Sequence, residues 1–134
     1  MASLTQLSKR LGLFRWLPFV VTAVCIFYAS SRGGDELPSF GVIDFLVKKG
    51  GHITGYFLLA ATLRFALEDR LNPLLVYLTC MVYALSDEFH QSFSVGRTAT
   101  LFDVMVYDQI GILLGGFGDK LLAVIRTLVR NLHH

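Results

Sequence analysis

Residues 16–31 read WLPFVVTAVCIFYASS, an uncharged run of sixteen residues that begins after Arg15 and ends before Arg32. Sixteen residues in an α-helix extend about 24 Å. Arginine side chains that reach toward the headgroups at both ends, with a few flanking residues, bring this length close to the roughly 30 Å of a bilayer's hydrocarbon core. The run therefore predicts a membrane-spanning helix at about residues 12–31.

The same run also fits a cleaved signal peptide. The basic residues Lys9, Arg10 and Arg15 precede it, and Ala29-Ser30-Ser31 at its end resembles a weak cleavage site. Cleavage would remove the first span and would leave the orientation of the other spans unchanged.

The composition of the whole chain also points to a membrane protein. Of its 134 residues, 54% are apolar and only 16% are charged, whereas about 25% of a typical soluble domain is charged. This composition argues against an ordinary soluble domain, a disordered chain, a coiled coil and a nucleic-acid-binding module. The net charge of +2 is too small to imply a polyanionic partner. The length is that of one domain, which we place at residues 1–134.

Three further apolar stretches are candidates for spans, at about residues 50–67, 72–90 and 101–124. The third span should begin at Asn72 and Pro73, because these residue types are preferred at the N-cap and at the first position of a helix. Short links join the stretches. The sequence therefore predicts an all-α fold, a polytopic membrane helical bundle of four transmembrane helices with short loops.

The positively charged residues set the predicted orientation. Eight Lys and Arg residues lie on one side of the predicted spans and four on the other: Lys9, Arg10, Arg15, Arg64, Arg70, Lys120, Arg126 and Arg130 against Arg32, Lys48, Lys49 and Arg97. Because cytoplasmic loops carry the excess of Lys and Arg, both termini should be cytoplasmic. The loops at 32–49 and 92–100 should face outward. The tail from Lys120 to His134 is either the end of the fourth helix or an amphipathic stretch on an anionic membrane surface.

Most polar residues near the spans fall at this outer end. His52 and Tyr56 lie one helical turn apart, and Asp87, His90 and Gln91 share a helix face. Ionisable groups at membrane depth are costly and mark functional sites. The alternative is that these groups only pair across helices and hold the bundle together, although such hydrogen bonds average only about 0.6 kcal/mol.

Two glycine pairs predict close helix contacts. Gly51-x-x-x-Gly55 and Gly111-x-x-x-Gly115 are small-residue faces of the kind that lets membrane helices approach each other. A close contact between the second and fourth spans would bring His52 near Asp108.

At these residues the sequence resembles the VanZ-like family of small integral membrane proteins. The resemblance rests on KGGHITGY at 49–56 and SDEFHQSF at 86–93, followed by Gly96-Arg97, Asp103-Val104 and the glycines from Gly111 to Gly115. It implies that the family's polar positions are Lys49, His52, Tyr56, Asp87, Glu88, His90, Gln91, Arg97 and Asp103.

One spacing departs from the family pattern, in which a second polar residue follows the span-four aspartate by four residues. Asp108 follows Asp103 by five residues, which turns an α-helix about 140° past a full turn. Either Asp103 lies before the helix proper, or a π-bulge intervenes, or Asp108 is not the equivalent position.

The resemblance implies a multi-pass protein of the bacterial inner (cytoplasmic) membrane, in the cell envelope. Through its founding member it also implies an association with resistance to the glycopeptide teicoplanin, but it does not supply a reaction. The expected partners are membrane lipid and a lipid-linked envelope substrate, and no nucleic acid is expected. Neither the cofactor nor the oligomeric state follows from the sequence.

Two functions stay open for this site. As an enzyme acting on an envelope lipid, the protein would use His52 or His90 as general base or nucleophile, with Asp87 orienting it. Arg97 and Lys49 would then bind an anionic phosphate. As a binding protein, it would hold an amphiphile with the same residues, Tyr56, Glu88, Gln91 and Asp103 among them.

The remaining alternatives are a divalent-metal site and a purely structural accessory protein. His52, Asp87, His90 and Asp103 are residue types that bind divalent ions, but the spacing is a weak metal signal and we assign no metal ligands. Cys25 and Cys80 form no zinc or disulfide pattern, and neither a phosphate-binding loop nor a serine-hydrolase motif occurs.

Overall fold

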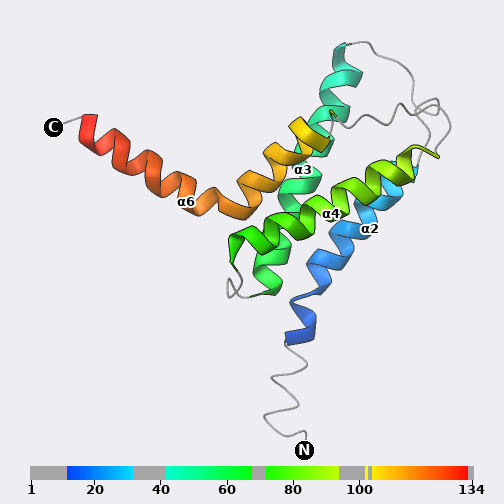
Figure 1. Cartoon of the computed structure of the whole chain (residues 1–134), viewed down its shortest axis with the longest axis horizontal. Helices are drawn as coiled ribbons and strands as arrows, with labels where there is room; N and C mark the ends of the chain where they lie inside the picture. Colours follow the sequence, from blue (N-terminus) through cyan, green and yellow to red (C-terminus); the bar gives the residue numbers. More distant parts are fainter. Residues whose placement is uncertain (1–11, 32–41, 68–71, 94–101, 103, 133–134) are drawn as a thin grey trace, which may run out of the picture.

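The computed structural model describes residues 12–31, 42–67, 72–93, 102 and 104–132. Within these ranges every regular element is helical. The elements are α2 (Leu17–Ser31), α3 (Val42–Ala66), α4 (Pro73–Gln91), the π-helix η2 (Val104–Asp108) and α6 (Gln109–Leu132) (Figure 1). The all-α prediction is therefore confirmed. The helix α3 begins eight residues before the predicted span at Gly50, and α6 continues past the predicted end at Val124.

Successive helices run in alternating directions (Figure 1). The chain passes up α2, down α3, up α4 and down the first part of α6, so the end of α2, the start of α3, the end of α4 and η2 meet at one end of the bundle. As predicted, α4 starts with Pro73 after an Asn72 cap, whose Oδ1 accepts a 3.0 Å hydrogen bond from the backbone N–H of Leu74. A core of side chains from α3, α4, η2 and α6 fills the centre: Tyr56, Leu59, Ala60, Leu63, Val76, Cys80, Ala84, Val104 and Ile112.

The close contact predicted between the second and fourth spans is confirmed at Gly111 and Gly115. A Cβ atom on Gly111 would overlap the carbonyl oxygen of Ile53 and lie 2.9 Å from the backbone nitrogen of Phe57. A Cβ atom on Gly115 would overlap the carbonyl oxygen of Phe57 and lie 3.0 Å from Cβ of Ala60. Only glycine lets α6 come this near to the backbone of α3.

The prediction for the other pair, Gly51 and Gly55, is wrong. A Cβ atom on Gly51 would meet nothing within 4 Å, and one on Gly55 would make an ordinary 3.4 Å contact with Ile26 of α2. The reason is helical phase: the face of α3 that meets α6 is formed by Ile53, Phe57 and Ala60, and the glycines at 51 and 55 lie on other faces.

Among the described residues, one helix is long and apolar enough to cross a membrane. It covers Gly12–Ser31, has a mean hydropathy of 1.7, and its most apolar window has no buried residue. A helix of this kind near the N-terminus is typical of a membrane span and also of a signal sequence. In α3 and α4 the polar residues of the predicted site, such as His52 and Asp87, lower the hydropathy. In α6 the charged residues Asp119, Lys120 and Arg126 lower it. Four spans are thus not established by hydropathy.

Candidate functional site

The π-helix η2 sets the position of Asp108 at the start of α6. A π-helix closes its hydrogen bonds from i to i+5, so each turn includes one residue more than an α-helical turn. Asp108 is the last residue of η2, and its side chain is 1% exposed. Of the three explanations for the five-residue spacing, the structure shows the π-bulge. Asp103 itself lies outside the described residues.

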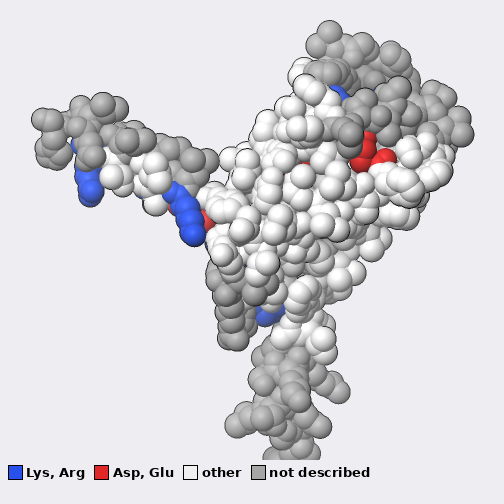
Figure 2. Space-filling model, in the orientation of Figure 1, with Lys and Arg blue, Asp and Glu red and all other residues white. Residues whose placement is uncertain are grey.

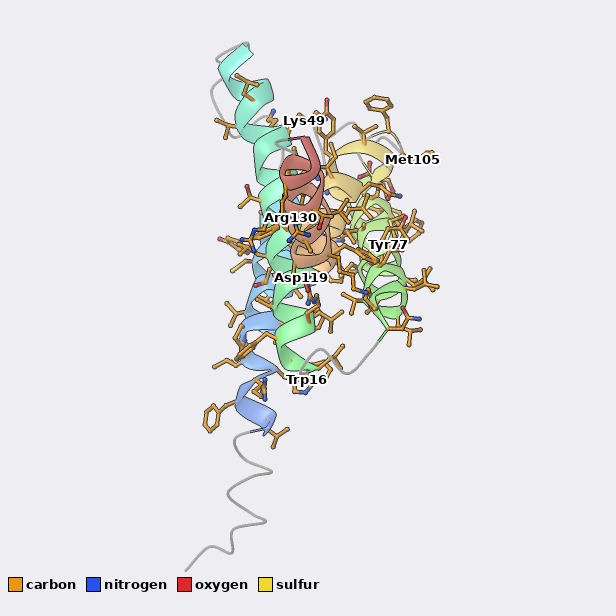
Figure 3. The ribbon with its side chains drawn as sticks, turned by 90° about the vertical axis from the view of Figure 1, so that its left-hand side faces the viewer. Trp16, Lys49, Tyr77, Met105, Asp119 and Arg130 are labelled. Carbon is orange, nitrogen blue, oxygen red and sulfur yellow. The ribbon has the colours of Figure 1, made fainter. Side chains whose placement is uncertain are left out.

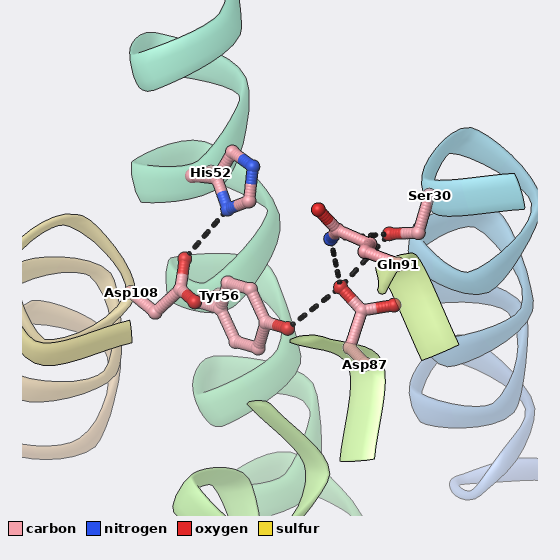
Figure 4. Close-up of polar contacts among 6 residues, drawn as sticks. All are labelled: Ser30, His52, Tyr56, Asp87, Gln91 and Asp108. Atoms are coloured by element: carbon pink, nitrogen blue, oxygen red, sulfur yellow. Dashed lines mark hydrogen bonds and ion pairs between the residues drawn. The ribbon is translucent and has the colours of Figure 1, made fainter. Parts of the chain in front are cut away.

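His52 and Asp108 form a directly bonded pair. Nδ1 of His52 lies 2.8 Å from Oδ1 of Asp108, and 17% of the His52 side chain is exposed (Figure 4). When Asp108 is ionised, its carboxylate only accepts hydrogen bonds, so Nδ1 of His52 is the donor and carries a proton. In the neutral ring, Nε2 is then the basic nitrogen. A carboxylate that fixes the tautomer in this way is the arrangement that orients a catalytic histidine or a metal-binding one.

Asp87 is the centre of a second, fully buried group. Its Oδ2 accepts hydrogen bonds from Ser30 Oγ at 2.8 Å, Gln91 Nε2 at 2.9 Å and the Tyr56 hydroxyl at 3.1 Å (Figure 4). Gln91 Nε2 also lies 3.1 Å from Ser30 Oγ. These donors come from α2, α3 and α4, so one carboxylate oxygen joins three helices.

The other oxygen of Asp87 has no such support. Oδ1 is buried and has no hydrogen-bond partner in the part of the chain that the structure describes. The whole residue is only 4% exposed. A buried acceptor without a donor costs about 1–3 kcal/mol, and more when it is charged. A donor from outside the described residues would remove this cost.

Tyr56 connects the two groups. Its hydroxyl donates to Asp87, while its ring is stacked beside that of His52 with centroids 6.4 Å apart. The side chain is buried at 1% exposure. The predicted residues His52, Tyr56, Asp87 and Gln91 are therefore brought together, and Asp108 joins them.

The structure pairs His52 with the carboxylate of Asp108, and the role of Asp87 in orienting a histidine stays a prediction. Nε2 of His90 lies 3.0 Å from Oγ of Ser31, and its ring stacks on Phe27 at 4.3 Å. Asp87 and His90 share a face of α4 as predicted, but their side chains meet different residues at the end of α2.

The remaining predicted residues fall in three places. Glu88 is buried at 6% exposure, next to Asp87 in α4. The ammonium group of Lys49 lies 4.9 Å from the centroid of the Tyr107 ring, a cation–π contact. Arg97 lies outside the described residues, as does Asp103. Figure 2 shows carboxylate side chains at the upper end of the molecule, where α2 and α4 end.

The sequence analysis missed the two serines that end α2. Ser30 and Ser31 contact Asp87, Gln91 and His90. In the sequence, the one feature that points to them is that two residues with hydroxyl groups end the apolar run at its predicted outer end. Tyr83 of α4 adds a further link to α2, because its hydroxyl donates to the backbone oxygen of Ala23 at 2.6 Å.

No group of three or more His, Cys, Asp or Glu side chains in the described ranges has the arrangement to hold a metal ion. What the described residues do offer is an oriented imidazole beside a buried carboxylate network, at the end of a helical bundle. Such a group can exchange a proton through His52 and can receive a hydrogen-bond donor at Asp87.

Comparison with known proteins gives one match. The model of the VanZ/LLP1 family matches residues 2–122, which include every residue of the site. No curated protein and no solved structure matches the chain.

Proposed function

The chain belongs to the VanZ/LLP1 family, and we propose that it is a multi-pass protein of the bacterial cytoplasmic membrane with a polar binding site at its outer face. The ligand is the polar headgroup of a lipid, a lipid-linked envelope precursor or a glycopeptide-type amphiphile. The observation that carries the proposal is the cluster around Asp87 and Asp108, which η2 and three α-helices build at one end of the bundle.

Membrane insertion is supported by the distribution of polar and apolar side chains. The acidic and amide groups Asp87, Glu88, Gln91 and Asp108 are buried. Large apolar residues cover the outside of the same helices, among them Leu74, Leu75, Leu78, Val82, Leu85, Phe89, Leu113 and Leu114. A soluble protein rarely exposes so much continuous apolar surface, whereas lipid tails would cover it.

Helix length supports spanning as well. With 25 and 19 residues, α3 and α4 extend about 37 and 28 Å, and a bilayer's hydrocarbon core is about 30 Å thick. In these two helices Tyr56, Asp87, Glu88 and Gln91 are buried, so these polar residues do not oppose insertion of the folded bundle.

The orientation rests on the distribution of Lys and Arg, which places both termini in the cytoplasm and the Asp87 end outside. A cysteine at Ser39 or Ser94 should react with a membrane-impermeant reagent in intact cells. A cysteine at Thr5 should react only after lysis. Reaction at Thr5 in intact cells would overturn the orientation, and the unsubstituted protein, with Cys25 and Cys80, gives the background.

Binding of a headgroup is supported by the unsatisfied oxygen of Asp87. A hydroxyl or amine of a headgroup would supply the donor that Oδ1 lacks in the described part of the chain. The buried carboxylates of Asp87, Glu88 and Asp108 favour a donor that is neutral or positively charged at that point.

A second candidate function, catalysis, is favoured by the pair of His52 and Asp108. In this version His52 takes or gives the proton during phosphoester or acyl chemistry on the bound lipid, and Asp108 holds its ring. The expected phosphate ligands, Arg97 and Lys49, stay predictions.

Lipid retention tests the proposal. Protein extracted in polymer nanodiscs should retain a specific envelope lipid, detected by mass spectrometry, and Asp87→Asn should lose it. Asp119→Asn, at the opposite end of the bundle, should retain it. The same lipid complement in all three proteins would overturn the site.

Two further measurements separate the candidates. Turnover of labelled envelope lipids by the wild type, lost in Asp108→Asn, would establish catalysis. Stoichiometric metal in the purified protein would instead favour the metal-binding alternative. Loss of folded yield in proportion to the loss of function in all site variants would favour the purely structural one.

A further inference from the structure

We propose that the C-terminal segment of α6, residues 119–132, is a surface-lying helix that binds the anionic lipids of the cytoplasmic leaflet. The proposal takes from the previous section only the insertion of the bundle and its orientation. It does not depend on what the site at the outer end binds.

The segment leaves the bundle. In Figure 1 the C-terminal part of α6 extends away from the other helices, and in Figure 3, turned by 90°, Asp119 and Arg130 appear close together as the segment is viewed along its length. Both views show it running across the direction of α3. If α3 spans the membrane, a helix in this direction lies along the membrane plane.

The start of the segment is fixed at the cytoplasmic end. Arg64, in the last turn of α3, binds Asp119 through two nitrogens, at 2.7 and 3.2 Å. This bidentate pair anchors the segment beside the end of α3 that is opposite the Asp87 cluster. It also neutralises the charge of Asp119, which is the only acidic residue in the segment 119–132.

The charge of the remaining segment is positive. Lys120, Arg126 and Arg130 are exposed, and Figure 2 shows the basic side chains along one edge of the segment, the edge that faces away from the outer end. Cations in this position face the cytoplasmic headgroups, which carry the negative surface potential of the bilayer.

The sequence pattern supplies the apolar side of the helix. Apolar residues recur at helical spacing, at Leu121, Leu122, Ile125, Leu128, Val129 and Leu132. Of the intervening positions, Ala123, Val124, Arg126, Thr127 and Arg130 are exposed, and Val124 is the only large apolar residue among these five. An apolar stripe opposite Lys and Arg is the pattern of helices that lie in the membrane interface.

Depth measurement on the full chain tests this placement. The protein carries Cys25→Ser, keeps the buried Cys80, and receives one new cysteine for a nitroxide label at Ile125, Ala123 or Val24. It is reconstituted in nanodiscs of phosphatidylcholine alone or mixed with phosphatidylglycerol. Collision of the label with oxygen, which dissolves in lipid, is compared with collision with a water-soluble nickel complex.

In the anionic nanodiscs, the label at Ile125 should meet oxygen and the label at Ala123 the nickel complex. Arg126→Gln with Arg130→Gln should return the Ile125 label toward water. The shift should be larger in anionic than in zwitterionic nanodiscs and should shrink at high salt, because salt screens the attraction between charges.

The label at Val24, on the exposed side of α2, separates the two proposals. If Val24 meets oxygen while Ile125 meets the nickel complex in both lipids, the bundle is inserted and the surface-helix inference fails alone. If Ile125 is shielded from both probes, another protein chain covers it and the inference also fails. If Val24 itself meets water, membrane insertion fails.

Discussion

Nδ1 of His52 lies 2.8 Å from Oδ1 of Asp108, and this contact joins the middle of α3 to the last residue of a π-helix. Without the extra residue in the π-helical turn, residue 108 would be rotated by about 100°. It would then lie on a different face of the helix from the one that meets α3. The π-helical turn therefore has a clear structural effect: it places the carboxylate of Asp108 against His52.

A double-mutant cycle should show that this pair is energetically coupled. We expect His52→Ala and Asp108→Ala each to lower the free energy of unfolding in detergent. The double variant should lose less than the sum, with a coupling of about 0.5–3 kcal/mol, as for other residues in direct contact. Chemical unfolding followed by circular dichroism measures each term. Additive losses would mean that the two side chains do not interact in the folded protein.

Tyr56→Phe should destabilise the bundle by about 1.5–3 kcal/mol, because it removes a donor from a buried carboxylate and leaves the ring in place. Tyr77→Phe is the matched control. The Tyr77 hydroxyl donates to the uncharged amide oxygen of Gln109 at 2.8 Å, and its loss should cost only about 0.5–1.5 kcal/mol. The comparison uses the same unfolding measurement. Equal losses would show that the hydrogen bond from Tyr56 to Asp87 is no stronger than one to a neutral acceptor.

How far the sequence predicted this molecule depends on whether a feature is local. Three features are predicted from adjacent or helically spaced residues, and the structure confirms them: the cap at Asn72, the helix α4 and the small-residue face of Gly111 and Gly115. Gly51 and Gly55 have the same spacing and fail. The phase of a helix against its neighbours is set by packing of the whole bundle, which the spacing does not contain.

The partners of the site residues were the least predictable part. Helical periodicity placed Asp87 and His90 on one face of α4, but the residue that each meets is supplied by α2. Ser30 and Ser31 look like ordinary small residues at the end of an apolar run. The contact of Asp108 with His52 was predicted from the glycine face of the fourth span, and the structure confirms it. Whether Asp108 shares a helix face with Asp103 did not follow from the sequence, because one inserted residue changes the face on which every later side chain lies.

Gly115→Leu should sharply reduce the folded yield, since even a Cβ atom there overlaps the backbone of α3 at Phe57. Gly118→Leu is the control, because Gly118 is only half-buried and a Cβ atom there would meet none of the described residues within 4 Å. It lies three residues away in the same helix and carries the same change in helix propensity. Yield after membrane extraction and the melting temperature check both variants. Similar yields would show that α6 does not pack on α3 through this face.

The last prediction separates function from stability within the outer cluster. His90→Ala should leave a folded protein, because Ser31 still donates to the backbone oxygen of Phe27 at 2.7 Å after the ring is lost. The cost should be about that of one aromatic contact, 0.5–1.5 kcal/mol. Arg97→Ala should also fold, as a change in a predicted loop. Both should abolish function in a complementation or teicoplanin-resistance assay.

Asp87→Ala should behave differently. It removes the acceptor of three buried donors at once, on Ser30, Tyr56 and Gln91, and each buried donor left without a partner costs about 1–3 kcal/mol. The protein should therefore lose membrane-inserted yield as well as function, whereas Asp87→Asn, which keeps an acceptor oxygen, should recover much of the yield without the function. If His90→Ala and Arg97→Ala lose yield in proportion to function, the cluster holds the helices together and does nothing more. If they keep both, the functional centre lies elsewhere, and the surface helix after Asp119 becomes the segment to mutate next.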